Sequence, residues 1–484
     1  MTPITRRSFL SNALAAGAAA SALGGVSALA HAQESAAREA AATQARPNFL
    51  ILLTDDQRYD ALGCMGNEII QTPVMDELAR QGTLFRNAFV TTPICCTSRA
   101  SIFTGMYART HGVHDFATPL RPEHHAVSYP VMLHDAGYHT GFVGKYGVGP
   151  GPRPGAFDFF FGLPGNGRYL QEIDGETRHM TAMLRDAAVD YLSQRTPDEP
   201  FCLSVSFRAP HAEDYDPRPF PPDPSLEDLY KDAYIPPPEL ASEEWYDALP
   251  EFLKDTEGRV RWRNRYVTPE RYQESMRDMY RMITGIDRAI GRMLETMADA
   301  GVLDNTVVIL LSDNGTFVGD RGLADKWYAY EASIRVPMII HDPRNPRGNE
   351  ATPMALNIDV APTILSMAGI PTPDPIQGRD LTPLLAGERI PWRQDWYFEH
   401  LFEHPGIPRS EGVRTERWKY FRWLDQDPMP EELYDLEADP IEKQNLANDP
   451  AHADRLASMR ALLQSYRDRL PEAPAQAEAD SPDG

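Results

Sequence analysis

Two adjacent thiols stand at the start of a predicted helix, and an arginine follows one turn later: Cys95, Cys96 and Arg99. Pro93 excludes a helix that runs in from upstream, and Gly105 stands where the helix is expected to end. A thiol at a helix N-terminus beside a guanidinium group is expected to have a lowered pKa, which makes it a nucleophile. The alternative is a buried cysteine pair in a turn.

Acidic and amide side chains follow two apolar runs that have the character of buried strands. Each pair comes directly after its run: Asp55 and Asp56 after 47–54, and Asp313 and Asn314 after 305–312. Such runs are typical of strands covered on both faces of an α/β sheet, where sites lie at the carboxyl ends of the strands. The oxygen ligands suit Ca²⁺ or Mg²⁺ and not zinc. Taken alone, each pair fits a solvated turn equally well.

Basic side chains stand at further expected strand ends. Lys145 closes a strand expected over 138–145, and His211 follows one expected over 201–207. A lone histidine beside proline is more often a loop residue than a catalytic one. The one basic run, 259–271, has two interpretations: a grip on acidic sugars, or a solvated helix face with ion pairs.

These residues belong to motifs that resemble those of the type I sulfatases. Cys95 to Gly105 is similar to that family's signature, Cys-x-Pro-Ser-Arg-Ala followed by an apolar run and Thr-Gly. The resemblance continues from about Arg46 to about Tyr466, through the segments Asp313-Asn314-Gly315, Gly322 to Lys326, and Tyr330 to Pro337. It implies a formylglycine made from Cys95 by a maturation enzyme, and a divalent metal, Ca²⁺ or else Mg²⁺.

The resemblance also implies a role for each matched residue. The implied metal ligands are Asp55, Asp56, Cys95, Asp313 and Asn314, and the implied catalytic residues are Cys95, Arg99, Lys145, His211 and Lys326. In the family mechanism the hydrated aldehyde attacks sulfur, and His211 or Lys326 protonates the leaving alcohol. Transfer of a charged sulfuryl group needs mainly positioning and positive charge.

The chain departs from the family pattern at two places. Thr97 stands where the family usually has Pro, Ala or Ser, and Gly147 stands where it has a histidine. Glycine cannot carry a proton, so either another residue takes that role or the step is slower and water-assisted; we expect replacement. His111 and His114 are the candidates because their segment closely follows the signature.

The elements that position these residues predict an α/β protein. The 484 residues and the 42% hydrophobic content allow a substantial core, and four cysteines do not make a disulfide framework. By resemblance the fold is the alkaline-phosphatase-like sandwich: a large mixed sheet flanked by helices, and a small C-terminal α+β subdomain with a short antiparallel sheet. The net charge of −23 argues against nucleic acid as a partner.

The expected organisation has five parts. A twin-arginine-type signal peptide (1–32) and a spacer (33–46) precede a catalytic domain (47–385), a C-terminal subdomain (386–470) and a disordered tail (471–484). Gly and Ser dilute the apolar run of the leader, so we expect no stable membrane span. The protein is therefore expected to be exported, to the periplasm or beyond.

The function expected from all of this is hydrolysis of a sulfate ester, of a sulfated saccharide or of an aryl sulfate. Two alternatives stay open: a phosphonate monoester or phosphodiester hydrolase of the same fold, and an inactive sugar-binding homologue. Paired sulfate and phosphate esters would separate the first two, and sugar affinity without turnover would mark the third.

Overall fold

The structure is a computed structural model that describes residues 46–163 and 167–473. Pro47 begins the compact unit that carries the elements discussed below. The predicted signal peptide, nearly all of the spacer and the tail beyond Ala473 lie outside the described residues. Within the described residues, no helix is both long enough and apolar enough to cross a membrane.

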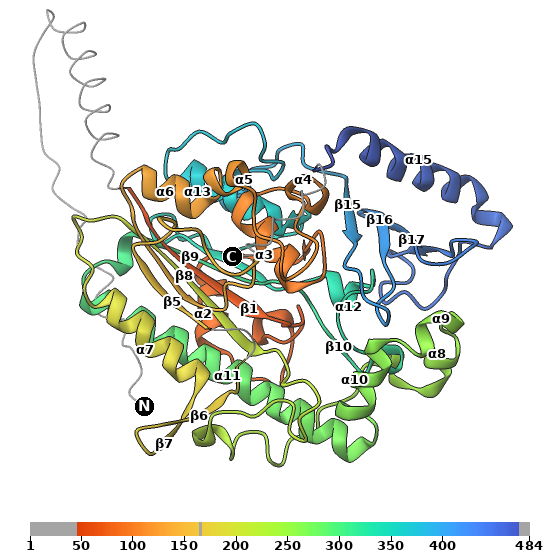
Figure 1. The fold of residues 1–484 in the computed structure, drawn as a ribbon, viewed down its shortest axis with the longest axis horizontal. Coiled ribbons are helices and arrows are strands. Elements are labelled where there is room, and N and C mark those ends of the chain that lie inside the picture. Colours follow the sequence, from red (N-terminus) through yellow and green to blue (C-terminus); the bar gives the residue numbers. More distant parts are fainter. Residues whose placement is uncertain (1–45, 164–166, 474–484) are drawn as a thin grey trace, which may run out of the picture. The chain divides into compact units, whose positions relative to one another are not determined.

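An eight-stranded mixed sheet forms the centre of the unit, in the order β13-β2-β12-β9-β1-β8-β4-β5 (Figure 1). Its strands are β1 (Asn48–Asp55), β2 (Thr83–Phe85), β4 (His139–Gly144), β5 (Phe159–Gly162), β8 (Phe201–Pro210), β9 (Thr306–Ser312), β12 (Met338–His341) and β13 (Asn349–Ala351). The five neighbours from β9 to β5 run parallel, whereas β12 is antiparallel to β9 and β2. Every residue of β1, β8 and β9 is buried, as the apolar runs predict.

Helices cover both faces of this sheet because successive side chains of each strand point to opposite faces. Leu50 and Leu52 of β1 pack with α2 (Pro73–Gln81), α7 (Met180–Leu192) and the long α11 (Pro269–Asp299). Phe49, Ile51 and Leu53 face the other way, toward α3 (Cys95–Thr104), α6 (Tyr129–Asp135) and α13 (Val360–Met367). The two helical layers are visible on either side of the sheet in Figure 1.

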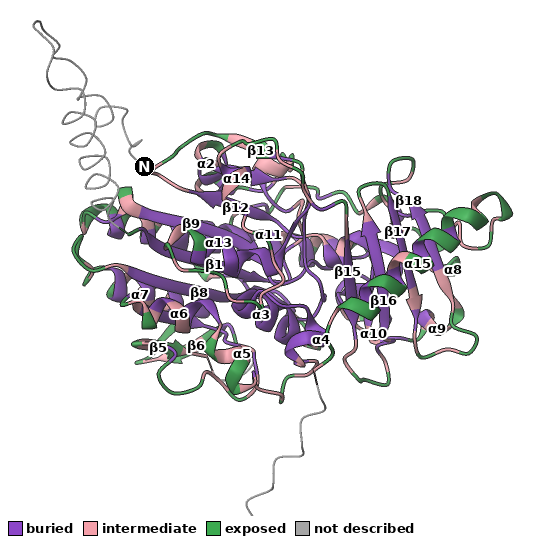
Figure 2. Cartoon of the chain, turned by 90° about the horizontal axis from the view of Figure 1, so that it is seen from above, coloured by how far each residue is buried: buried purple, intermediate pink, exposed green. Residues whose placement is uncertain are grey.

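A second, antiparallel sheet follows in the chain and contains β15 (Asp395–His400), β16 (Ser410–Thr415), β17 (Trp418–Trp423) and β18 (Glu431–Asp435). Its buried aromatic side chains, with Trp396 and Trp423 among the largest, make a third core with α15 (Ala453–Arg469). The strands are mostly buried while much of α15 is exposed (Figure 2). The expected fold class is confirmed, and the expected boundary at residue 385 stays a prediction.

Shorter elements connect these layers. The helices are α4 (Ala108–His111), α5 (Pro122–Ala126), α8 (Glu243–Asp247), α9 (Glu251–Lys254), α10 (Glu257–Arg265), α12 (Glu331–Ile334) and α14 (Thr382–Leu385). The two-residue strands β10 (Phe317–Val318) and β11 (Ala324–Asp325) pair as a hairpin. The start of the tail is held in place, because Ala473 N donates to Arg109 O and Thr110 Oγ1 donates to Pro471 O. The expectation of disorder from residue 471 onward stays a prediction.

Candidate active site at the carboxyl edge of the central sheet

Four parallel neighbours, β9, β1, β8 and β4, end at the same edge of the sheet. Asp55 is the last residue of β1, and the residues directly after the other three strands are Asp313, His211 and Lys145. The carboxyl ends of parallel strands converge, so residues far apart in sequence meet here. Ligand atoms of Asp55, Asp56, Cys95 and His211 lie within 4.8 Å of one another.

The end of β1 bends sharply so that both of its carboxylates face this edge. The register with β8 shifts between Leu53 and Asp55, and Asp56 has a φ of 62°, in the left-handed region. The Asp56 N–H donates to Asp313 Oδ1 at 3.3 Å, which ties the bend to the end of β9. The strained backbone is thus held by the partner carboxylate of the neighbouring strand.

Helix α3 starts at Cys95 and carries the nucleophile candidate into the site. The Cys95 Sγ lies 3.5 Å from Asp55 Oδ1. Arg99, one turn later, is completely buried and bonds both neighbouring strands, with Nη2 3.3 Å from Asp55 Oδ2 and Nε 2.8 Å from Asp313 Oδ2. Its Nη1 also donates to Ser206 Oγ of β8. Gly105 ends the helix with a φ of 67°, as expected for a C-terminal glycine.

The expected lowering of the Cys95 pKa is wrong. Every residue of α3 is buried, and burial raises the pKa of the Cys95 thiol far above its ordinary value. The Asp55 carboxylate adds to the rise, and the cations of Lys145 and Lys326 do not outweigh it. An unmodified thiol here is consequently a poor nucleophile.

Two lysines complete the site by pairing with the two adjacent carboxylates. Lys145 Nζ lies 2.5 Å from Asp55 Oδ2, and Lys326 Nζ lies 2.5 Å from Asp56 Oδ1. Burial opposes these charges, but the carboxylates raise the pKa of both lysines above the usual value, so both are cations at neutral pH. Together with Arg99, the two lysines therefore place three cations around the carboxylates.

His211 faces Asp56 with one defined nitrogen. Its Nδ1 lies 2.7 Å from the Ala212 carbonyl oxygen, which can only accept, so the neutral ring has its N–H at Nδ1. Its Nε2 lies 3.7 Å from Asp56 Oδ2. Burial and the Lys326 charge hold the pKa of His211 well below its usual value, and the neutral ring therefore presents an acceptor to the site.

The acidic residues fit a hard divalent cation. Asn314 Oδ1 is buried and has no hydrogen-bond partner among the described residues, while its Nδ2 donates to Asp56 Oδ1 at 2.5 Å. Burial raises the pKa of Asp56 to about 8 and also raises that of Asp313, with the Asp55 carboxylate adding to both. A bound cation would remove this penalty and satisfy the free amide oxygen. Asp55, Asp56, Asp313 and Asn314 are thus a consistent oxygen ligand set.

The residues that surround Lys326 come from segments whose association the sequence did not predict. Asp325 and Trp327, on either side of it, both have left-handed backbones, with φ of 67° and 84°. Arg261 of α10 contacts both, through an ion pair of 2.7 Å with Asp325 Oδ2 and through the Trp327 ring, whose centroid is 5.1 Å away. Of the two interpretations of the basic run, the ion-paired one describes Arg261 and Arg265, because both also pair with Asp214.

Gly147 lies beside Arg99, where the family histidine would be. A Cβ at this position would stand 2.9 Å from Arg99 Cδ, and the φ of +71° disfavours any other residue. His111 is buried and uses both ring nitrogens elsewhere, with Ser101 Oγ at 3.0 Å and Val113 N at 3.1 Å. Burial lowers the pKa of both His111 and His114. A proton-transfer role for either one stays a prediction.

Comparison with known proteins agrees with this architecture. The profile of the sulfatase family matches residues 47–370, and that of the N-sulphoglucosamine sulphohydrolase C-terminal region matches 319–469. An N-acetylglucosamine-6-O-sulfatase of Bacteroides thetaiotaomicron is 30% identical over 499 residues, covering 88% of each chain. An arylsulfatase of Clostridium perfringens is 29% identical over 469 residues, covering 86% of this chain and 94% of its own.

Solved structures give the same picture at the level of the fold. A protein in complex with its substrate D-glucosamine-2-N,6-O-disulfate superposes with a TM-score of 0.77, at 26% identity, over 89% of this chain and all of that one. The phosphonate monoester hydrolase of Agrobacterium radiobacter superposes with a TM-score of 0.73 at 23% identity, over 87% of this chain and 96% of its own. The second likeness concerns the fold alone.

Proposed function

Because this chain belongs to the sulfatase family and is a sulfuric ester hydrolase, we propose that its substrate is a sulfated saccharide and that residue 95 works as a formylglycine. One observation carries the proposal: Cys95 meets two carboxylates and His211 within 4.8 Å, amid the cations of Arg99, Lys145 and Lys326.

The chain's own residues would hold the sulfate and move one proton. Lys145 and Lys326 supply fixed positive charge for the sulfate oxygens, and Arg99 orients residue 95 while bonding Asp55 and Asp313. Lys326 is the better donor to the leaving alcohol oxygen, because it is protonated at neutral pH. The neutral His211 ring cannot donate from Nε2, so it contributes a proton there only as an imidazolium.

Two groups complete this chemistry. Ca²⁺ is the cation we propose, with Mg²⁺ as the alternative; held by Asp55, Asp56, Asp313 and Asn314, it supplies charge for the sulfate oxygens and for residue 95. Formylglycine supplies, as its hydrate, the attacking hydroxyl group. Formation of formylglycine requires a maturation enzyme as a partner. Thr97 is the position in the signature, which that enzyme recognises, where this chain differs from the usual family residues.

We further propose that the sulfated sugar of the substrate is a 6-O-sulfated glucosamine residue. The relative at 30% identity is an N-acetylglucosamine-6-O-sulfatase, and the solved structure at 26% identity is in complex with its substrate D-glucosamine-2-N,6-O-disulfate. The leader with Arg6 and Arg7 supports export through a twin-arginine route. We retain residues 47–385 as the catalytic domain and 386–470 as the C-terminal subdomain.

A screen of paired esters tests the proposal. The purified protein, loaded with Ca²⁺, is assayed on N-acetylglucosamine 6-sulfate, on aryl sulfate, and on the matching phosphate and phosphonate esters. We expect the highest kcat/KM on the sulfated sugar, and peptide mass spectrometry should find formylglycine at position 95. Preference for the phosphonate ester, or full activity with an unmodified Cys95, would overturn it.

A further inference from the structure

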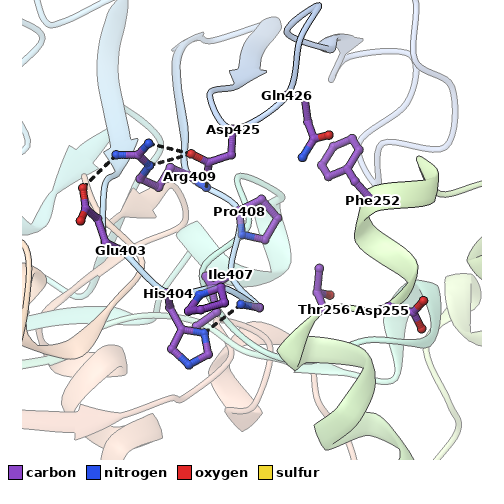
Figure 3. A pocket seen from close by; sticks show the side chains of 12 residues that line it. Phe252, Asp255, Thr256, Glu403, His404, Ile407, Pro408, Arg409, Asp425 and Gln426 are labelled. Atoms are coloured by element: carbon purple, nitrogen blue, oxygen red, sulfur yellow. Dashed lines mark hydrogen bonds and ion pairs between the residues drawn. The ribbon is translucent and has the colours of Figure 1, made fainter.

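A cavity of about 460 Å³ lies outside the catalytic cluster, between the C-terminal sheet and the helices α9 and α10 (Figure 3). Three segments form its wall: the end of α9 and the turn into α10, the 403–409 loop between β15 and β16, and the turn after β17. Phe252 and Thr256 line it from the first segment, His404 and Arg409 from the second, and Asp425 and Gln426 from the third. The volume is that of a small-ligand site.

The charge of this cavity does not suit a sulfate group. Asp255, Glu403 and Asp425 line it, against one arginine. Arg409 is already neutralised, with Nε 2.8 Å and backbone N 2.7 Å from the Asp425 carboxylate and Nη1 3.2 Å from Glu403 Oε1 (Figure 3). A second sulfate placed here would meet more negative than positive charge.

The remaining groups suit a ring that carries hydroxyl groups and one apolar face. The Gln426 amide has no partner anywhere in 46–163 or 167–473, and the His404 ring accepts at Nδ1 from Gly406 N, at 3.1 Å, which leaves Nε2 free. The His404 ring stacks on Phe402, with centroids 6.1 Å apart and an interplanar angle of 12°. Phe252 adds an aromatic ring to the wall. Carboxylates, an amide and aromatic rings together match the hydrogen bonds and the apolar face of a sugar.

The wall of the cavity is bonded to the segment that holds Lys326. Gly406 O accepts from Glu257 N, at 2.8 Å, at the start of α10. Glu257 Oε1 lies 2.8 Å from Arg261 Nε, and Arg261 pairs with Asp325, the neighbour of Lys326. A ligand in the cavity would therefore contact Thr256, the N-cap of the helix whose Arg261 pairs with the neighbour of Lys326.

We propose that this cavity binds an unsulfated sugar ring of the substrate, linked to the sulfated one, and that it rejects a sulfated ring. The inference rests on the proposed saccharide substrate and adds to it: the enzyme selects oligosaccharides whose sulfated residue is attached to an uncharged one. The Gln426 amide and the carboxylate oxygens, which accept hydrogen bonds from the sugar hydroxyl groups, hold the uncharged ring.

The test compares three substrates on matched variants. They are N-acetylglucosamine 6-sulfate, the disaccharide in which it is linked to galactose, and an aryl sulfate. Gln426→Ala should raise KM about three- to tenfold on the disaccharide alone, the effect of one lost hydrogen bond. Gln464→Ala, an amide exposed on α15, is the control and should change none of the three. Equal changes on all three substrates, or none on the disaccharide, would overturn the proposal.

A binding measurement separates this inference from the proposed function. The Cys95→Ala variant, which cannot turn over, is titrated with the disaccharide that carries a single sulfate, on N-acetylglucosamine, and with the same disaccharide carrying a second sulfate on galactose. The two ligands differ only in the sulfate on galactose; we expect the first to bind and the second to bind more weakly, and Asp255→Lys to reduce the difference. If no sulfate ester is hydrolysed by the active protein, the function fails, whereas equal affinity for the two disaccharides refutes only the assignment of this cavity.

Discussion

Two buried groups of charged residues in this protein use the same side-chain types in different arrangements. At the edge of the central sheet, the carboxylates of Asp55, Asp56 and Asp313 pair with the cations of Arg99, Lys145 and Lys326, and ligand atoms of Asp55 and Asp56 lie within 4.8 Å of those of Cys95 and His211. Next to the C-terminal sheet, Glu331 of α12 and Glu442 pair with Arg414 and Lys419.

The carboxylates of the second group are ion-paired within the group, although burial raises the pKa of Glu442, whose Oε1 has an ion pair with Lys419 but no hydrogen bond among the described residues. Arg414 Nε lies 3.0 Å from Glu331 Oε1, Lys419 bridges both carboxylates, and Glu442 Oε2 accepts from Glu331 N at 2.8 Å. Burial opposes its ionisation, but Arg414 and Lys419 lower the pKa of Glu331 to about 2. In the first group Asn314 Oδ1 has no partner in the described part of the chain, and the Asp56 pKa is raised to about 8. In the second group each carboxylate is neutralised by a cationic side chain, which stabilises the fold. In the first group the ligand atoms lie together around a point that a metal cation can occupy.

The largest expected effect separates the two adjacent thiols. Cys95→Ala removes the nucleophile and should lower kcat by at least about 10⁴-fold without changing the thermal unfolding midpoint. Cys96→Ala is the matched control, since Cys96 is equally buried and the one hydrogen bond of its Sγ among the described residues is with Thr97 Oγ1, at 3.7 Å. Comparable activity of the two variants would refute the role of residue 95.

Metal removal should act on the first charge group alone. A chelator should abolish activity, and it should also lower the unfolding free energy by about 3–4 kcal/mol when the cation had been present at about 100–1,000 times its Kd. Re-addition of Ca²⁺ or Mg²⁺ should restore both, and zinc should not. A Glu331→Gln variant should show the same chelator effect as the wild type, because its own group needs no metal. Stoichiometric zinc in the active protein would contradict the assignment.

An uncharged substitution in the second group should lower the unfolding free energy and leave kcat unchanged. Glu331→Gln leaves Arg414 under-compensated and should cost about 3–5 kcal/mol of unfolding free energy, with kcat per folded molecule retained. Because the folded-state pKa of Glu331 is lowered from 4.5 to about 2, its stabilisation is present above pH 4.5 and is lost as the pH falls toward 2. Denaturant titrations between those pH values should show the loss in the wild type and a smaller slope in the variant.

Arg261 should affect the reaction without touching the reacting atoms. Arg261→Ala removes one of the two guanidinium groups that pair with Asp325, the other being that of Arg265, and also removes the contact with the Trp327 ring. Because the backbones of Asp325 and Trp327 hold Lys326, kcat should fall about 10–100-fold. Arg261→Lys keeps the charge and should recover part of the loss, and Arg263→Ala, an exposed neighbour on α10, should be neutral. A loss confined to thermal stability, with kcat unchanged, would show that Arg261 is only structural.

The smallest expected effect concerns the missing family histidine. Gly147→Ala should cost about 1–3 kcal/mol of unfolding free energy, because the left-handed backbone is strained and the new Cβ meets Arg99. Gly66→Ala, with a φ of +99° and open space around it, measures the backbone part alone. Gly147→His should accordingly give no gain in kcat. A gain would mean that the proton-transfer role is still unfilled in this chain.

The sequence predicts the central strands and the residues at their ends because buried parallel strands leave a local signal. The apolar runs before Asp55 and Asp313 end at one sheet edge, and the convergence of the site follows from that geometry alone. The Arg261–Asp325 pair left no such signal, since it depends on how α10 packs against a hairpin 64 positions away. The Cys95 pKa was mispredicted for a similar reason: local sequence shows the helix start but not that α3 is buried on every side.

The catalytic cluster is assembled across most of the chain, since Lys326 reaches Asp56 over 270 positions and Arg99 reaches Asp313 over 214. Contacts of this range form late, after the entropy of closing long loops has been lost. A fragment without Asp313 and Lys326 therefore lacks the complete site, and catalytic activity becomes a reporter of complete folding. The order of events follows as well: residue 95 is enclosed once α3 has packed, so an enzyme that modifies it must act while the chain is still open.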